Sequence, residues 1–274
     1  MPIPTGVTAK GLSKLGREKA MLFDVYGTLV ISGAGECSAY KNHENQGAIR
    51  ELLRRFKIGK TVRQVQTALV DAIKGEHARL IEKGIDYPEI DILRIWRRML
   101  GWDDPSRLSA FAHAYELIVN PIFPMPGLME LLRSCRQRRL TLGIISNAQF
   151  YTQDLLEGIL ADKLETWGFD PRLIFYSYQH KRAKPSVHLF EMVARRLAAR
   201  GIQTDSVLYV GNDMRNDIQP AKEVGFQAAL FAGDQRSLRW RKADARCRDL
   251  RPDVVVTDLR QLIPAEHTAI GDKL

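Results

Sequence analysis

Short runs of apolar residues recur along the chain and alternate with stretches that have a helical period. Each run is long enough for one buried strand. The predicted strands are Met21–Val25, Leu140–Ile145, Leu173–Tyr176, Val207–Val210, Ala228–Phe231 and Val254–Val256, and the predicted helices between them are Leu128–Arg138, Gln153–Trp167, Val187–Arg200 and Asn216–Val224. Buried strands that alternate with amphipathic helices form parallel sheets. The pattern therefore predicts an α/β fold with a parallel sheet and helices on both faces.

The alternation stops once, directly after the first predicted strand. The chain is then helical in pattern until prolines 121, 124 and 126, which we expect to stiffen a linker back to the sheet. The candidate helices are Asn45–Phe56, Val62–Lys83, Glu89–Leu100 and Ser106–Val119. We predict a core domain of residues 1–32 and 123–274 and an inserted helical cap domain of residues 33–122. Because parallel sheets bind ligands at the carboxyl ends of their strands, we favour a lid over a mere packing domain.

The composition is that of a globular protein with a basic surplus. Of 274 residues, 45% are hydrophobic and 27% charged, and 41 Lys and Arg outnumber 32 Asp and Glu, which gives a net charge of +9. Much of the surplus lies in two runs, at residues 50–63 and 236–251. We expect these runs to be solvated faces, with anion steering or weak nucleic-acid contact as alternatives. Aromatic residues are not interleaved with them as in nucleic-acid recognition motifs, so we expect a small anionic substrate rather than nucleic acid.

The cysteines and the apolar runs bear on the cellular compartment. Cys37, Cys135 and Cys247 lie far apart and form no CxxC pattern, which argues against a disulfide framework and a zinc site. The first residues lack the apolar segment of a signal peptide, and no apolar run is long enough to cross a membrane. We therefore expect a soluble, cytoplasmic protein without a membrane partner.

Four polar clusters lie where the predicted strands end or the next helix begins. They are Asp24 to Thr28 after the first strand, Ser146-Asn147 after the second, Lys184-Pro185-Ser186 before a helix, and Gly211 to Asp217 after the fourth strand. A carboxylate that emerges from an apolar strand is costly to bury unless it is paired or binds a cation. Since the carboxyl ends of parallel strands share one edge, we expect these four clusters to form one site.

Together these clusters resemble the haloacid dehalogenase superfamily of hydrolases. The resemblance covers about residues 18–32 and 123–265 and implies a Rossmann-like core. It implies that Asp24 is the nucleophile, that Thr28, Ser146 and Asn147 donate hydrogen bonds, that Lys184 holds nucleophile and phosphoryl oxygens together, and that Asp24, the Tyr26 carbonyl, Asp213 and Asp217 hold Mg²⁺. The chemistry agrees, because a carboxylate that attacks an anionic phosphoryl group needs cations and fixed donors to offset charge repulsion.

Tyr26 departs from the phosphatase pattern of this family. Phosphatases usually carry a second aspartate there, as general acid and base, and a tyrosine with a pKa of about 10 is a poor base at neutral pH. The Asp-x-Tyr-Gly-Thr form resembles 2-haloacid dehalogenases, whose halide leaving group needs no proton and which need no metal. The spacing of Asp213, Asn216 and Asp217 instead resembles the magnesium-binding form of phosphatases.

We therefore expect a Mg²⁺-dependent hydrolase of a small phosphorylated metabolite. The alternatives are metal-free hydrolysis of a carbon–halogen bond and a non-catalytic binding protein that retains the fold. A phosphatase without the second aspartate needs a substrate with a good leaving group, or an acid from the cap. Glu36, His43 and Glu44 are candidates for that acid, although solvated cap surface is the simpler interpretation of all three. We expect Trp96 and Trp102 to serve packing.

Overall fold

The computed structural model describes residues 1–32 and 45–264, and its centre is one parallel sheet. Six strands lie in the order β5-β4-β1-β6-β7-β8, and every neighbouring pair is parallel. Their bounds are β1 Ala20–Phe23, β4 Thr141–Ser146, β5 Phe169–Tyr176, β6 Val207–Gly211, β7 Gln227–Phe231 and β8 Val254–Val256. Each strand overlaps a predicted apolar run. Because β1 lies between β4 and β6, the ends of these three strands bring the polar clusters together.

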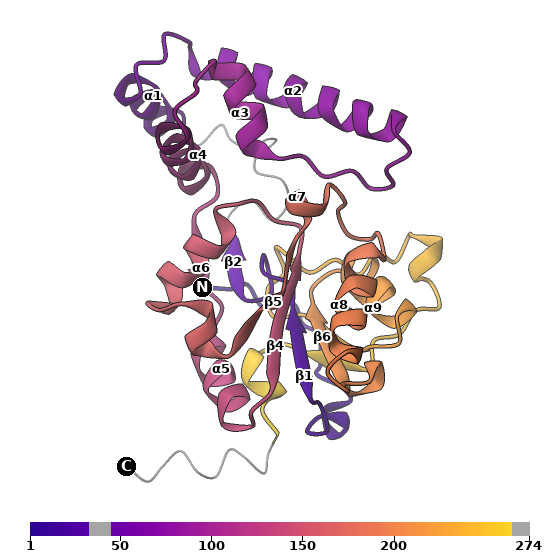
Figure 1. Cartoon of the computed structure of the whole chain (residues 1–274). Helices are drawn as coiled ribbons and strands as arrows, with labels where there is room; N and C mark the ends of the chain where they lie inside the picture. The colour runs from indigo at the N-terminus through magenta and orange to yellow at the C-terminus, as the bar shows by residue number, and fades with distance from the viewer. Residues whose placement is uncertain (33–44, 265–274) are drawn as a thin grey trace.

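Helices cover both faces of the sheet, as predicted (Figure 1). On one face α5 (Leu128–Gln137) and α6 (Thr152–Leu160) bury their apolar sides in one cluster. On the other face α8 (His188–Ala198) and α9 (Gln219–Glu223) pack in a second cluster. All four residues of β1 are fully buried between these layers, which explains why this strand has no alternating polar face. The α/β, Rossmann-like fold is therefore confirmed.

Two predicted helices have different limits. The first ends at Leu160, since Ala161 has a left-handed backbone, and a separate 3-10 turn follows at Leu164–Trp167. The second begins earlier than predicted, with a π-helical turn at Met214–Ile218 that precedes α9. The side chain of Asp213 caps this turn by accepting hydrogen bonds from two main-chain amides.

The segment predicted to be a proline-stiffened linker contains a strand. Ile122–Pro124 forms β3, which pairs antiparallel with β2 (Val30–Ser32). Each strand has three residues, too few to show an alternating pattern in the sequence. This strand was not predicted, and the β2–β3 pair joins the two connections between core and cap.

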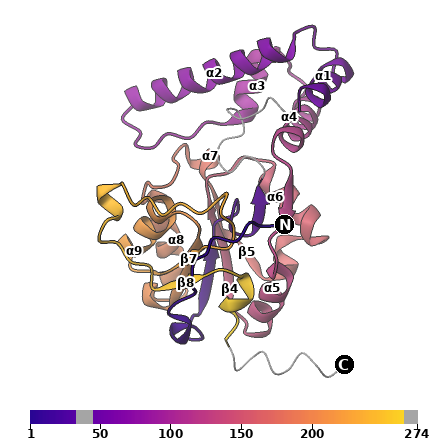
Figure 2. The same cartoon turned by 180° about the vertical axis from the view of Figure 1, so that it is seen from behind.

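The inserted helices lie together above the carboxyl ends of the strands (Figures 1 and 2). They are α1 Gln46–Arg55, α2 Val62–Glu82, α3 Ile92–Leu100 and α4 Pro105–Val119, and their apolar sides form a separate cluster. Trp96 is 1% exposed, and its ring lies 5.0 Å from those of Phe111 and Tyr115. Trp102 stacks on Phe56 at 6.0 Å, so both tryptophans serve packing, as expected. None of the helices in the described ranges combines the length and apolarity needed to span a membrane.

Candidate active site

Asp24 follows β1 directly and is the point on which the polar clusters converge. Its side chain is buried, and one carboxylate oxygen, Oδ1, accepts hydrogen bonds from Ser146 Oγ at 2.8 Å and Lys184 Nζ at 2.7 Å. Its main-chain amide donates to Val210 O at 2.9 Å, so the backbone is anchored to β6. Within residues 1–32 and 45–264 no hydrogen bond or ion pair engages Oδ2. One oxygen is therefore held, and the other is available for attack.

Lys184 is the central cation of the site. Its Nζ donates to Asp24 Oδ1, to Asp217 Oδ1 at 2.6 Å and to the Tyr209 hydroxyl at 3.1 Å. Burial alone would lower the pKa of Lys184, but the carboxylates of Asp217 and Asp24 outweigh it and raise the pKa above the ordinary value. Asn147 holds the main chain of this residue, accepting from its N at 2.7 Å and donating to its O at 3.2 Å. The site lysine is thus charged and fixed at both ends.

Asp217 lies behind the lysine and positions it. Burial raises the pKa of Asp217 to about 6, against the opposing effect of Lys184. Its second oxygen accepts from the main-chain N of Asp213 at 2.9 Å. The Tyr209 hydroxyl lies 3.0 Å from Asp217 Oδ1 and 2.9 Å from Ile145 O. Sequence reasoning missed Tyr209, because a tyrosine within the apolar run of β6 is indistinguishable from a core residue.

Asp213 is bound by an arginine from the basic run at residues 236–251. Arg241 Nε lies 3.1 Å and 3.2 Å from the two oxygens of Asp213, and Nη2 lies 2.6 Å from Oδ2. The main chain of Arg239 pairs with the same motif, donating to Asn212 O at 2.9 Å. The expectation of a solvated face was therefore wrong for this part of the run. No sequence motif marks Arg241, because its partner lies on a separate segment.

The turn after Asp24 packs closely against the fourth cluster. Gly27 has a φ of 80°, and a β-carbon there would collide with the side chains of Asn212 and Ser237. Thr28 is fully buried, and its hydroxyl has no hydrogen-bond partner among the described residues. Since Thr28 does not line the cavity in front of Asp24, its contact with a substrate stays a prediction.

A cavity of about 400 Å³ lies in front of Asp24, between core and cap. Both parts contribute residues to its wall. The core supplies Asp24, Tyr26, Asn147, Lys184, Asn212, Asp213, Asp217 and Arg239, and the cap with its connections supplies Ser32, His77, Pro88, Glu89, Glu116 and Asn120. Cap residues thus cover Asp24, which is the arrangement expected of a lid.

Tyr26 cannot replace the missing second aspartate. Its hydroxyl is hydrogen-bonded to Thr152 Oγ1 at 2.9 Å. Burial, and then the charge of Glu116, raises the pKa of this phenol further above its ordinary value. A phenol that holds its proton this firmly is an ineffective acid at neutral pH. The other candidates for the acid lie outside the described residues; they are Glu36, His43 and Glu44. The same holds for Cys37.

The oxygen atoms beside Asp24 are of the kind that a magnesium ion binds. Three carboxylates of this cluster, those of Asp24, Asp213 and Asp217, pair directly with Lys184 and Arg241. Arg239 also lines the cavity. In the described ranges no three acidic, imidazole or thiol side chains converge on one point. Mg²⁺ accepts carbonyl oxygens and keeps several waters, so it does not need three such ligands. Asp24 Oδ2 and the Tyr26 carbonyl are the oxygens that would hold the ion, because Arg241 and two main-chain amides bind the Asp213 carboxylate and Lys184 binds Asp217. Binding of the ion by Asp213 and Asp217 stays a prediction.

Comparison with known proteins agrees with this geometry. The chain is 23% identical over 158 residues to the rhythmically expressed gene 2 protein of Drosophila melanogaster, a match that covers 52% of this chain and 58% of that protein. Its structure is similar to an HAD phosphatase from Thermococcus onnurineus (19% identity, TM-score 0.53, 89% of this chain and 95% of the other). It is also similar to a 2-haloacid dehalogenase from Pseudomonas syringae pv. Tomato DC3000 (17% identity, TM-score 0.55, 89% and 96%). At these identities the structural matches show the fold alone.

A family model that spans all four polar clusters shows the family of this chain. The family model of haloacid dehalogenase-like hydrolases matches residues 18–225. That range contains Asp24, Ser146, Lys184 and Asp217, which the structure brings into direct contact. The chain therefore belongs to the haloacid dehalogenase-like hydrolases.

Proposed function

We propose that this hydrolase uses Asp24 as a covalent nucleophile on a small phosphorylated metabolite, with Mg²⁺ as cofactor. The observation that carries the proposal is the asymmetric anchoring of the Asp24 carboxylate, with Oδ1 held by Ser146 and Lys184 and Oδ2 available at the cavity. A nucleophile held in this way needs little reorganisation before attack. The acids beside it support the choice of a phosphoryl substrate, because carboxylate oxygens are ligands that Mg²⁺ prefers.

The chain's own residues provide most of the chemistry. Asp24 Oδ2 attacks phosphorus, the bond to the leaving group breaks, and an aspartyl phosphate forms. Lys184 and Ser146 hold Oδ1 and offset the charge that develops, and a water then attacks phosphorus and releases Asp24. When bound, Mg²⁺ would neutralise charge on the nucleophile and the phosphoryl oxygens.

A second candidate is hydrolysis of a 2-haloacid, and Tyr26 favours it. A halide leaves without a proton, so a site without an acid two residues after the nucleophile suffices. Asp24 Oδ2 would then attack the carbon that bears the halogen, and water would hydrolyse the resulting ester at its carbonyl carbon. The same anchoring of Asp24 supports this reaction.

An isotope experiment separates the two reactions. The protein is assayed for phosphate release with and without Mg²⁺ or EDTA, and in parallel for halide release from 2-chloropropionate. A single turnover in H₂¹⁸O is followed by mass spectrometry of the peptide that contains Asp24. Attack of water on phosphorus leaves Asp24 unlabelled and labels the phosphate, whereas hydrolysis of a carbon ester labels Asp24.

Asp24→Asn tests the common step. The variant should lose all turnover while it retains the folded structure, because the amide has no carboxylate to attack with. If every activity survives in Asp24→Asn, the covalent mechanism is wrong. A folded wild-type protein that turns over no phosphate ester or haloacid would favour the non-catalytic binding protein instead.

A further inference from the structure

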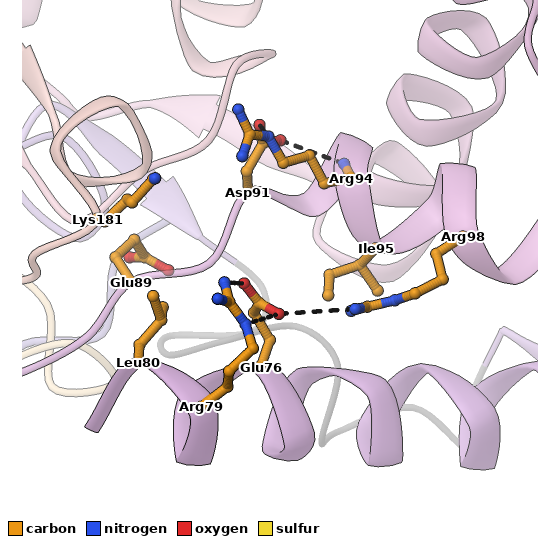
Figure 3. Close-up of a pocket in the computed structure, with 9 residues that line it drawn as sticks. All are labelled: Glu76, Arg79, Leu80, Glu89, Asp91, Arg94, Ile95, Arg98 and Lys181. Carbon is orange, nitrogen blue, oxygen red and sulfur yellow. Dashed lines mark hydrogen bonds and ion pairs between the residues drawn. The ribbon is translucent and has the colours of Figure 1, made fainter. Parts of the chain in front are cut away.

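Glu89 lies at the junction between cap and core, on the segment that connects α2 to α3. This segment is fastened to the turn after α7 (Ser177–His180) by main-chain hydrogen bonds. Glu89 N donates to Lys181 O at 3.1 Å, and Ala183 N donates to Tyr87 O at 2.7 Å. Figure 3 shows the Glu89 side chain close to Lys181, beside the start of α3. These hydrogen bonds hold the main chain of a cap residue against the core.

Two polar side chains of the core, those of Ser177 and Gln149, orient the Glu89 carboxyl group. Ser177 Oγ donates to Glu89 Oε2 at 2.7 Å, and Gln149 Nε2 lies 3.3 Å from Oε1. Ser177 Oγ itself accepts a hydrogen bond from Ala148 N at 3.0 Å, and Glu89 Oε2 is a nearer acceptor for its single proton than Ala148 O, which lies 3.4 Å away. Ala148 and Gln149 follow Ser146-Asn147 directly in the chain. The residues that hold the nucleophile are therefore continuous with those that hold Glu89.

Glu89 borders two cavities. It lines the cavity in front of Asp24 and also a smaller one of about 200 Å³ between α2, α3 and Lys181, which Figure 3 shows. Burial raises the pKa of Glu89 to about 7, although hydrogen bonds from Ser177 and the Ile90 amide oppose the rise. Near neutral pH both the acid and the carboxylate forms are then populated, which is the condition for donating and accepting a proton in one cycle.

The charged groups around Glu89 come from four elements. They are Glu76, Arg79 and His77 of α2, Asp91 and Arg94 at the start of α3, Lys181 after α7, and Lys184 across the active-site cavity. Most of the side chains nearest to it are paired with each other. Glu76 binds Arg79 and Arg98, and Asp91 binds Arg94 at 3.2 Å. Burial rather than one neighbouring charge therefore governs the proton affinity of Glu89.

The other carboxyl groups that line the active-site cavity have other partners. Among the described residues, Asp24, Asp213 and Asp217 belong to the cluster around Lys184 and Arg241. Glu116 accepts a hydrogen bond from Asn120 Nδ2 at 2.9 Å, next to the β2–β3 connection. Of the described acids that line this cavity, Glu89 is the one that takes part in neither network.

We propose that Glu89 is the general acid and base for the reaction that Asp24 begins, in place of the aspartate that Tyr26 replaces. The role rests on the proposed function. In the first step the Asp24 Oδ2–P bond forms, the bond from phosphorus to the leaving oxygen breaks, and that oxygen takes the Glu89 proton. In the second step the Glu89 carboxylate takes a proton from water, the water oxygen bonds to phosphorus, and the P–Oδ2 electron pair returns to Asp24. Glu89 ends protonated, and one water is consumed.

Glu89→Gln is tested on two substrates that differ in leaving group. Phenyl phosphate expels a strongly basic phenolate, and p-nitrophenyl phosphate expels a weakly basic one. The variant should lower kcat/KM about 10²–10⁴-fold for phenyl phosphate and much less for p-nitrophenyl phosphate. The inflection near neutral pH in the wild-type profile should disappear in the variant. If the wild-type protein turns over 2-chloropropionate, whose halide needs no proton, the variant should release one halide per site and accumulate the Asp24 ester, visible by mass spectrometry.

Controls separate this role from a structural one. Glu76→Gln changes a cap acid that borders only the smaller cavity, and it should leave turnover and the pH profile unchanged. Equal losses on both phosphate esters together with an unchanged pH profile would overturn the role of Glu89. Since Asp24→Asn removes all turnover if the proposed function holds, loss of activity in that variant but no leaving-group effect in Glu89→Gln rejects the Glu89 role alone. Activity that survives in Asp24→Asn rejects the proposed function itself.

Discussion

Substituting the buried lysine at the centre of the site should destabilise the protein strongly. Lys184→Met keeps the length of the side chain but removes a charge that contacts Asp24 and Asp217 at 2.7 Å and 2.6 Å. The lysine and Asp217 side chains are only 3% and 1% exposed, so water screens this pair poorly. Removing one partner of a buried ion pair costs about 3–5 kcal/mol, because the other charge is left uncompensated. We expect a loss of this size in the free energy of unfolding near neutral pH.

The loss should depend on pH, with a sign set by the carboxylates that remain. Without the lysine, which lowers it, burial raises the folded-state pKa of Asp217 further above its unfolded value. When the pKa of a carboxyl group is higher in the folded state than in the unfolded state, the protein loses stability as the pH rises from the lower pKa to the higher one. The reason is that the unfolded state ionises more readily in this range. The deficit of Lys184→Met relative to wild type should therefore be larger at about pH 7.5 than at about pH 5.

Urea unfolding followed by circular dichroism at the two pH values measures this deficit. Lys222→Met is a matched control, because Lys222 pairs with Asp253 at 2.8 Å but its side chain is 36% exposed. A pair of that kind contributes about 0–1 kcal/mol. If Lys184→Met costs no more than Lys222→Met, or costs the same at both pH values, the electrostatic account of the site is refuted.

Two further predictions concern the surroundings of Asp213 and the nucleophile turn. Arg241→Met removes the charged hydrogen bonds to buried Asp213 and should lower the free energy of unfolding in urea by about 1.5–3 kcal/mol. Titration calorimetry should show tighter Mg²⁺ binding to this variant, because the competing positive charge is gone. Weaker binding would contradict the charge argument. Gly27→Ala should destabilise the protein by more than about 1 kcal/mol, because its β-carbon meets Asn212 and its φ is 80°. The control Gly47→Ala, in α1 with open space around it, should be neutral or stabilising by calorimetric melting.

The apolar pattern predicted the sheet well because buried strands leave a direct signature. Every strand of the parallel sheet overlaps an expected run, including β1, all of whose residues are buried. The short strands β2 and β3 left no such signature, since three residues cannot show a period. Helix ends were less predictable because they depend on caps and left-handed residues, such as Ala161 and the side chain of Asp213.

Residues of the candidate site that stand at or near a strand end could be predicted from the sequence. Contacts between residues far apart in the chain could not. Asp24, Ser146 and Lys184 stand in recognisable clusters, and the parallel sheet brings such clusters to one edge. Arg241 meets Asp213 from a basic run that looks like any solvated face. Glu89 meets Ser177 across 88 positions of the chain.

The sequence by itself determined the α/β fold, the inserted helices and the polar clusters that follow the strand ends, because burial and strand-end chemistry are encoded locally. Only the tertiary structure decided how the charges balance. It placed Lys184 between Asp24 and Asp217, and it set Arg241 on Asp213. It also buried Glu89 beside the cavity. The physical reason is that burial and the distance between charges control proton affinity and ion-pair strength, and neither quantity exists until distant segments pack together.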